Sequence, residues 1–242
     1  MQKTLEPRTR VGKFAVLGFI IAELVLSFVI QYTSGHVCAA FSYTAVCLAL
    51  LMGVLTVTPI LGRAGNIPVL VGLGFTVLAD LCLVVISPPE RLFGMIFFLG
   101  TQISYAVCLY LREAGRVRII HLALRASLTA LAVIITLLVL GSGADALSVI
   151  SVVYYANLLL NVALAFLDAG RHLCFALGLT CFALCDLFVG LDLIHLYLPV
   201  AEGSFIWQLT HTGINTAWLF YVPSLTLIPI DPALGVLRDL LK

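Results

Sequence analysis

The chain has 242 residues, of which 62% are hydrophobic and only 10% are charged, and its formal net charge is +1. Soluble domains are about 45–50% apolar and about 25% charged, so a soluble core of this size cannot bury the excess. Lipid must therefore solvate much of the surface, which predicts an integral membrane protein. Near-zero charge, without a basic stripe interleaved with aromatic residues, argues against a nucleic-acid partner.

Apolar stretches of about 20 residues are long enough to cross a bilayer. Eight such stretches follow one another along the chain, near residues 14–32, 38–57, 67–87, 92–111, 118–140, 146–166, 172–194 and 204–228. Proline and glycine interrupt the runs where loops are needed. The first stretch carries Glu23 and no clear cleavage site follows it, so we interpret it as a span and not a signal peptide. The pattern predicts an all-α bundle of eight transmembrane helices.

Lysine and arginine gather on alternate loops of this eight-span arrangement. One side holds eleven of them: Lys3, Arg8, Arg10, Lys13, Arg63, Arg112, Arg116, Arg118, Arg171, Arg238 and Lys242. The opposite loops hold Arg91 alone. Basic loops stay in the cytoplasm, so both termini are predicted to be cytoplasmic. Arg125 lies inside the fifth stretch and is expected to extend its head group to the basic side.

The chain divides into a cytoplasmic segment (1–13), a transmembrane domain (14–228) and a tail (229–242). The tail starts with the helix signal Asp231-Pro232, and leucines then recur at helical spacing. We expect it to form a short amphipathic helix on the inner membrane surface, with a frayed tail as the alternative. Short loops and the lack of a targeting signal favour a bacterial cell membrane.

Four carboxylates occur within the predicted spans, where a charge costs a few kcal/mol, and one of them, Asp192, lies near the outer end of the seventh span, where water can reach it. Glu23 lies near the middle of the first span, and Asp80 and Asp186 lie past the middle of the third and seventh, towards the outer side. Both aspartates fall in the third helix of a four-helix half, within Leu78-Ala79-Asp80-Leu81 and Leu184-Cys185-Asp186-Leu187. Two parallel halves related by an axis along the membrane normal would bring these carboxylates to one depth, facing each other.

Other polar residues recur on single helix faces. The stripes are Tyr154, Asn157 and Asn161 in the sixth span, Gln208, His211 and Asn215 in the eighth, and Gln102 with Tyr105 in the fourth. Turned inward, they would line one polar cavity open towards the outer half, with Glu23 also facing inward. The alternative is that the asparagines and glutamines only join helices, and that His211 is a packing histidine.

The seven cysteines all lie in or beside apolar runs, which is typical of buried free thiols and shows no disulfide framework. Cys181 and Cys185 share a helix face, but no histidine lies near them at ligand spacing, so no metal site is expected. No phosphate loop or dinucleotide fingerprint is present, and no cofactor is expected.

Four segments resemble those of the lysoplasmalogenase family, also called YhhN-like, of eight-helix membrane proteins. They are GFTVLADLCLV (74–84), FFLGTQISYAVCLY (97–110), FALCDLFVG (182–190) and WLFYVPSLTLI (218–228). The chain keeps the aspartates of the third and seventh helices as Asp80 and Asp186, and the tyrosine of the fourth as Tyr105. It departs from the family where a histidine of the fourth helix is Gln102 and where a glycine is Ala79.

The resemblance implies hydrolysis of the vinyl-ether bond of lysoplasmalogens to a fatty aldehyde and a glycerophospho head group. That chemistry needs a general acid to protonate the vinyl carbon and a base nearby, which Asp80 and Asp186 would supply. The remaining inward-facing polar residues would bind the substrate, a membrane lysophospholipid. Two alternatives stay open: a lipid-binding membrane protein without catalysis, suggested by Gln102, and a proton-coupled transporter that uses the intramembrane carboxylates and His211.

Overall fold

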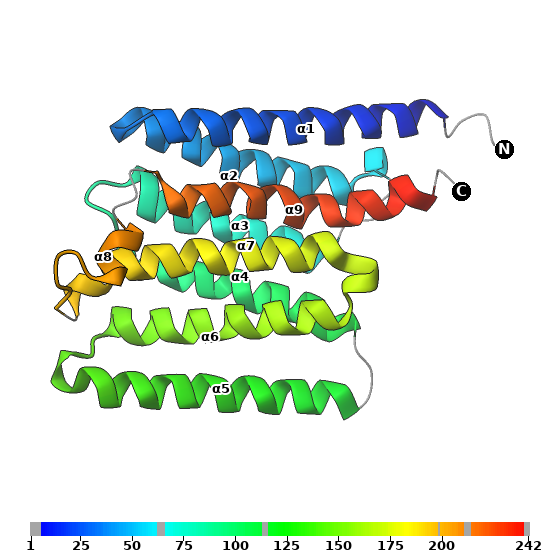
Figure 1. The fold of residues 1–242 in the computed structure, drawn as a ribbon. Coiled ribbons are helices and arrows are strands. Elements are labelled where there is room, and N and C mark those ends of the chain that lie inside the picture. Colours follow the sequence, from blue (N-terminus) through cyan, green and yellow to red (C-terminus); the bar gives the residue numbers. More distant parts are fainter. Residues whose placement is uncertain (1–5, 62–65, 113–115, 198, 211–213, 240–242) are drawn as a thin grey trace.

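The structure is a computed structural model that describes residues 6–61, 66–112, 116–197, 199–210 and 214–239. These residues form helices and no strands, and eight helical segments are long and apolar enough to cross a membrane (Figure 1). The long helices are α1 (Glu6–Tyr32), α2 (Gly35–Val57), α3 (Ile67–Asp80), α4 (Arg91–Arg112), α5 (Arg116–Leu140), α6 (Ala146–Leu167), α7 (Ala169–Leu193) and α9 (Thr216–Asp239). The predicted all-α architecture of eight spans is confirmed.

The long helices lie side by side, with α1 at one edge of the bundle and α5 at the other (Figure 1). Helix α1 begins and α9 ends at the same end, which we call the terminal end. The opposite end, called the distal end, carries the short helix α8 (Phe205–Thr210). An even number of spans explains why both termini lie on one side, and the assignment of that side to the cytoplasm stays a prediction from the loop charges.

The packing repeats between the two halves of the chain. Helices α1, α2, α3 and α4 pack in sequence, and α5, α6, α7 and α9 do the same. Between the halves, α2 packs on α9 as α6 packs on α4. This is the pattern expected of two parallel four-helix halves. The largest departure is that α1 also packs on α9, whereas α5 packs mainly on α6 and makes no comparable contact with α4.

The eighth span differs from the predicted segment 204–228. It occupies Thr216–Leu234, and the earlier residues form the separate helix α8. Asn215 explains the restart, because its side chain accepts a hydrogen bond from the backbone N–H of Trp218 at 3.5 Å and so caps the start of α9. The predicted stripe of Gln208, His211 and Asn215 is therefore wrong for the two residues described: Gln208 and Asn215 are exposed, and His211 lies outside the described residues.

The predicted helix start at Asp231 is also wrong, since α9 continues through this residue to Asp239. Asp231 is buried and serves α7 instead of capping a new helix. Its carboxylate accepts the backbone N–H of Phe175 at 3.2 Å and contacts Nδ1 of His172 at 2.7 Å. These bonds attach α9 to α7 as far as Asp231.

Close packing of α3 on α4 depends on Gly72. A Cβ atom at this position would lie 2.4 Å from Cε1 of Tyr105, whose ring is almost completely buried and cannot move aside. We expect Gly72→Ala to lower the free energy of unfolding by about 1–3 kcal/mol through overpacking. Gly74→Ala is the matched control in the same helix, because nothing lies within 4 Å of its added Cβ.

Thermal unfolding of both variants in one detergent tests this. Gly72→Ala should melt below the wild type, whereas Gly74→Ala should melt at or above it, since alanine favours the helix. Equal stabilisation by both substitutions would contradict the packing of Gly72 against Tyr105.

Candidate active site

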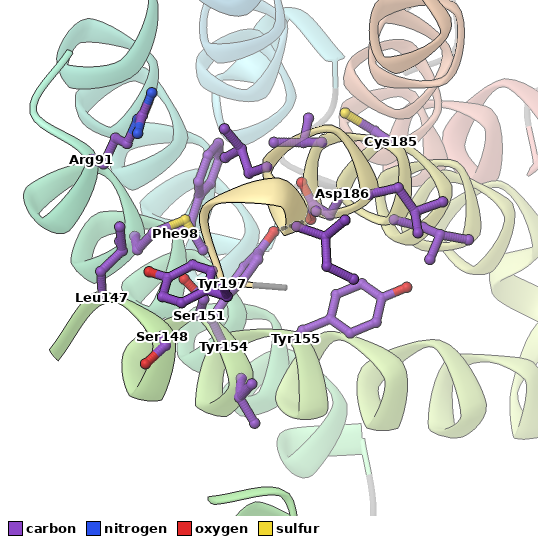
Figure 2. A pocket seen from close by; sticks show the side chains of 18 of the residues that line it. Arg91, Phe98, Leu147, Ser148, Ser151, Tyr154, Tyr155, Cys185, Asp186 and Tyr197 are labelled. Carbon is purple, nitrogen blue, oxygen red and sulfur yellow. Dashed lines mark hydrogen bonds between the residues drawn. The ribbon is translucent and has the colours of Figure 1, made fainter. Parts of the chain in front are cut away.

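A cavity of about 740 Å³ opens in the distal half of the bundle. Side chains of α4, α5, α6, α7 and α9, and of the π-helical turn η2 (Leu81–Val85) after α3, line it (Figure 2). Most lining residues are apolar, and the charged ones are Asp80, Asp186 and Arg91. The two aspartates from the two halves thus meet at one cavity, as the predicted parallel repeat requires.

Asp80 is the last residue of α3 and is 3% exposed. The chain continues from it as η2, and π-helical turns in membrane and soluble helices often mark functional sites. The hydroxyl of Tyr221, a buried residue of α9, donates a hydrogen bond to Oδ2 of Asp80. The carboxylate is therefore held by a helix of the other half.

Asp186 lies in α7 and is half-buried, because its carboxyl group borders the cavity. The hydroxyl of Tyr154 in α6 donates a hydrogen bond to its Oδ2 (Figure 2). Tyr154 is buried and lines the cavity itself. Each aspartate therefore has a tyrosine donor, but from different helices of the second half, so these bonds do not follow the repeat.

The ring of Phe98 joins the two aspartate–tyrosine pairs. Its centroid lies 5.7 Å from that of Tyr154 and 6.5 Å from that of Tyr221. Phe182 closes the cluster with a centroid 5.6 Å from Phe98. Aromatic packing of this kind fixes the tyrosine rings and hence the hydroxyls that orient both carboxylates.

A second polar cluster, named here the Arg125 network, lies between α4, α5 and α6. Arg125 donates to Oδ1 of Asn157 at 2.6 Å and to Oδ1 of Asn161 at 2.7 Å. Asn161 in turn donates to the backbone carbonyl of Gln102 at 2.9 Å and to its Oε1 at 3.0 Å. These acceptors hold the Arg125 guanidinium against α6, and the expectation that it extends to the basic side stays a prediction.

The Arg125 network also changes the place of three predicted substrate-binding residues. Gln102, Asn157 and Asn161 face inward as predicted, but none of them lines the cavity. Their amide groups bond to one another and to Arg125, which is the helix-joining alternative. The expectation of a single cavity lined by all the polar stripes is therefore wrong.

The remaining predicted residues also lie away from the cavity. Tyr105 is buried and packs edge-on against Phe175, with ring centroids 5.7 Å apart. Glu23 is 0% exposed in α1, and its oxygens accept no hydrogen bond from the part of the chain that the structure describes. Asn215 caps α9 and donates its backbone N–H to Oε1 of Gln31 at 3.0 Å.

The distal rim carries groups that the sequence pattern did not single out as a site. Arg91 starts α4 and Tyr197 follows α7, and both line the cavity (Figure 2). The Tyr197 hydroxyl donates to the carboxylate of Asp145 at 3.3 Å. Asp145 caps α6, and the backbone N–H of Ser148 holds the pKa of this carboxyl group below its ordinary value. The sequence did contain a signal for this rim, since Arg91 is the single lysine or arginine of the predicted distal loops.

The model of the YhhN family matches residues 13–213. Comparison with curated proteins and with solved structures found no match. The matched segment contains both aspartates and the helices α3 and α7 that carry them, and it ends before α9, which supplies Tyr221. The chain, whose described residues contain eight helical segments long and apolar enough to cross a membrane, therefore belongs to the YhhN family.

Proposed function

We propose that this protein is a membrane hydrolase that cleaves the vinyl-ether bond of lysoplasmalogens, with Asp80 and Asp186 as the catalytic acid–base pair. The single observation that carries the proposal is the meeting of both aspartates at one largely apolar cavity inside the membrane-spanning bundle. Charged groups at this depth are costly and generally serve a function.

The reaction suits a pair of carboxyl groups. A proton is transferred to the vinyl carbon that does not carry oxygen, which leaves an oxocarbenium ion at the other vinyl carbon. Water adds there, and the resulting hemiacetal breaks its bond to the glycerol oxygen, which takes the proton. One water is consumed, and a fatty aldehyde and a glycerophospho head group form. The two carboxyl groups share one proton as a coupled pair. The protonated carboxyl group protonates the carbon, and the ionised carboxylate stabilises the cation and accepts the proton of water.

The shape and lining of the cavity also fit the substrate class. A volume of about 740 Å³ lies within the range of about 300–1,000 Å³ typical of small-molecule pockets. Apolar residues of α5 and α6, among them Ala132, Ile135 and Leu159, offer a surface to a single hydrocarbon chain. The edge position of α5, which packs mainly on α6, places this surface beside the bilayer from which such a lipid comes.

The departure at Gln102 does not touch the proposed site. Gln102 lies one turn beyond Phe98 on α4 and belongs to the Arg125 network, outside the cavity lining. Loss of a proton-carrying histidine at this position therefore leaves the aspartate pair and its tyrosine donors in place, which supports catalysis over binding alone.

The proposal is tested with purified protein in detergent. The wild type should release long-chain aldehyde from 1-alkenyl-glycerophosphoethanolamine, measured by a coupled aldehyde dehydrogenase. A family member with established activity serves as the positive control. Stable lipid binding without aldehyde would replace the proposal by a non-catalytic lipid-binding role, and proton-driven uptake by proteoliposomes without aldehyde would replace it by transport.

A further inference from the structure

Arg91 is the lone cation among the residues that line the cavity, whose other charged members are the two aspartates. It is the first residue of α4, at the distal rim, and its side chain is exposed. Within the described ranges, no hydrogen bond or ion pair of its guanidinium is found. A cation that borders a cavity and is not held by the protein is available to a ligand.

The position of Arg91 fixes what part of a ligand it can meet. Phe98 lies seven positions after Arg91 on α4, which corresponds to about 10 Å along the helix axis. Phe98 marks the level of the catalytic pair, because its ring contacts both tyrosines that bond the aspartates. Figure 2 shows Arg91 and Asp186 on either side of Phe98. An extended arginine side chain spans much of this separation, and a three-carbon glycerol unit spans the rest.

The rim around Arg91 contains a second polar element. Tyr197 lines the cavity together with Arg91, and its hydroxyl donates to the carboxylate of Asp145, which lies outside the cavity lining. Asp145 is already engaged by the Ser148 backbone N–H and by the Tyr197 hydroxyl. Glu90 precedes Arg91 and is exposed, outside the cavity lining. Of these groups, Arg91 alone both lines the cavity and carries a positive charge.

We propose that Arg91 binds the phosphate of the substrate's head group and so sets the vinyl ether at the level of Asp80 and Asp186. This inference rests on the proposed function. Guanidinium matches phosphate with two parallel N–H donors, which gives orientation as well as affinity. The bound lipid then has its phosphate at the rim, its glycerol beside Phe98 and its chain along the apolar residues of α5 and α6. Substrates without a phosphate lose this orientation.

Kinetics on two lipids with the same vinyl ether test the proposal. One is 1-alkenyl-glycerophosphoethanolamine, and the other is 1-alkenylglycerol, which lacks the phosphate. Arg91→Gln should lower kcat/KM for the phospholipid by about 10- to 100-fold, mainly through KM, and leave the 1-alkenylglycerol unchanged. Arg91→Lys should recover part of the loss. The control, Arg171→Gln, removes an exposed arginine at the terminal end and should change neither lipid. Equal loss on both lipids would overturn the assignment.

A binding measurement decides the matter independently of turnover. Trp218 lines the cavity, so its fluorescence in a Trp207→Phe background reports binding there. The probe is 1-O-alkyl-glycerophosphoethanolamine, which has no vinyl ether to cleave. It should bind about 10- to 100-fold more weakly to the Arg91→Gln variant, whereas 1-O-alkylglycerol should bind both proteins alike. Unchanged phospholipid affinity, or an equal response to inorganic phosphate alone, would overturn phosphate recognition in a lipid. Intact recognition without aldehyde release would overturn only the proposed hydrolysis.

Discussion

Asp186→Asn should lower the turnover of lysoplasmalogen about a hundredfold or more, and Asp80→Asn should do the same. Asparagine keeps the size of the side chain and can still accept the bond from Tyr154 or Tyr221, but it cannot transfer a proton. Proton transfer by a placed side chain contributes about 10²–10⁴-fold to rates. The loss should appear in kcat with KM nearly unchanged, because the apolar contacts to the chain remain. Initial rates of aldehyde release measure it.

The matched control is Asp192→Asn, which removes an exposed carboxylate farther along the same helix, outside the cavity lining. It should retain the wild-type rate. The double variant Asp80→Asn/Asp186→Asn should be little slower than either single variant, because groups that act as one unit are not additive. If each single variant lost only severalfold in rate and the two losses multiplied in the double variant, both aspartates would have a structural role only.

Asn161→Leu should destabilise the protein more than other single changes of similar size in the bundle. It removes an acceptor of the buried part of Arg125 and both donors to Gln102, while filling about the same volume. Hydrogen bonds to charged groups are worth more than neutral ones, and we expect a loss of about 2 kcal/mol. A decrease of about 4–8 °C in Tm, measured in detergent, corresponds to this loss.

Thr180→Val is the control for Asn161→Leu, since its hydroxyl donates to the Ala176 carbonyl one turn earlier in its own helix. It should change Tm little. Adding Arg125→Met to Asn161→Leu should recover stability relative to Asn161→Leu alone, because an apolar side chain no longer needs the lost acceptor. A Tm of the single Asn161 variant equal to that of the Thr180 variant would contradict the role given to the Arg125 network.

Hydropathy was sufficient to predict the eight spans, because a bilayer requires long apolar helices and leaves few alternatives. It misplaced the eighth span, because the apolar residues on both sides of a break form one continuous apolar run in the sequence. In the structure, Asn215 caps α9 and so marks where the eighth span begins. Sequence spacing assumed an unbroken helix, so the stripe through Gln208 could not be distinguished from a real one.

The aspartates were predictable for a physical reason, since a carboxylate within a span is too costly to persist without a role or a partner. Hydrogen bonds between helices satisfy an amide without a functional role, so the inward position of the amides did not distinguish a cavity from a helix contact. Gln102, Asn157 and Asn161 join helices. The tyrosine donors Tyr154 and Tyr221 come from segments far from their aspartates in sequence. Such long-range pairings depend on the packing and leave no local pattern.

The most direct measurement is hydrolysis of a lysoplasmalogen in D₂O, with the aldehyde reduced to the alcohol as it forms and analysed by mass spectrometry. If the aspartate pair protonates the vinyl carbon, the wild-type product should carry one deuterium on the carbon next to the former carbonyl carbon. The Asp186→Asn variant should give almost no product. Unlabelled aldehyde carried through the same procedure measures any later exchange. A product without deuterium, or equal product from Asp186→Asn, would contradict acid catalysis at this cavity.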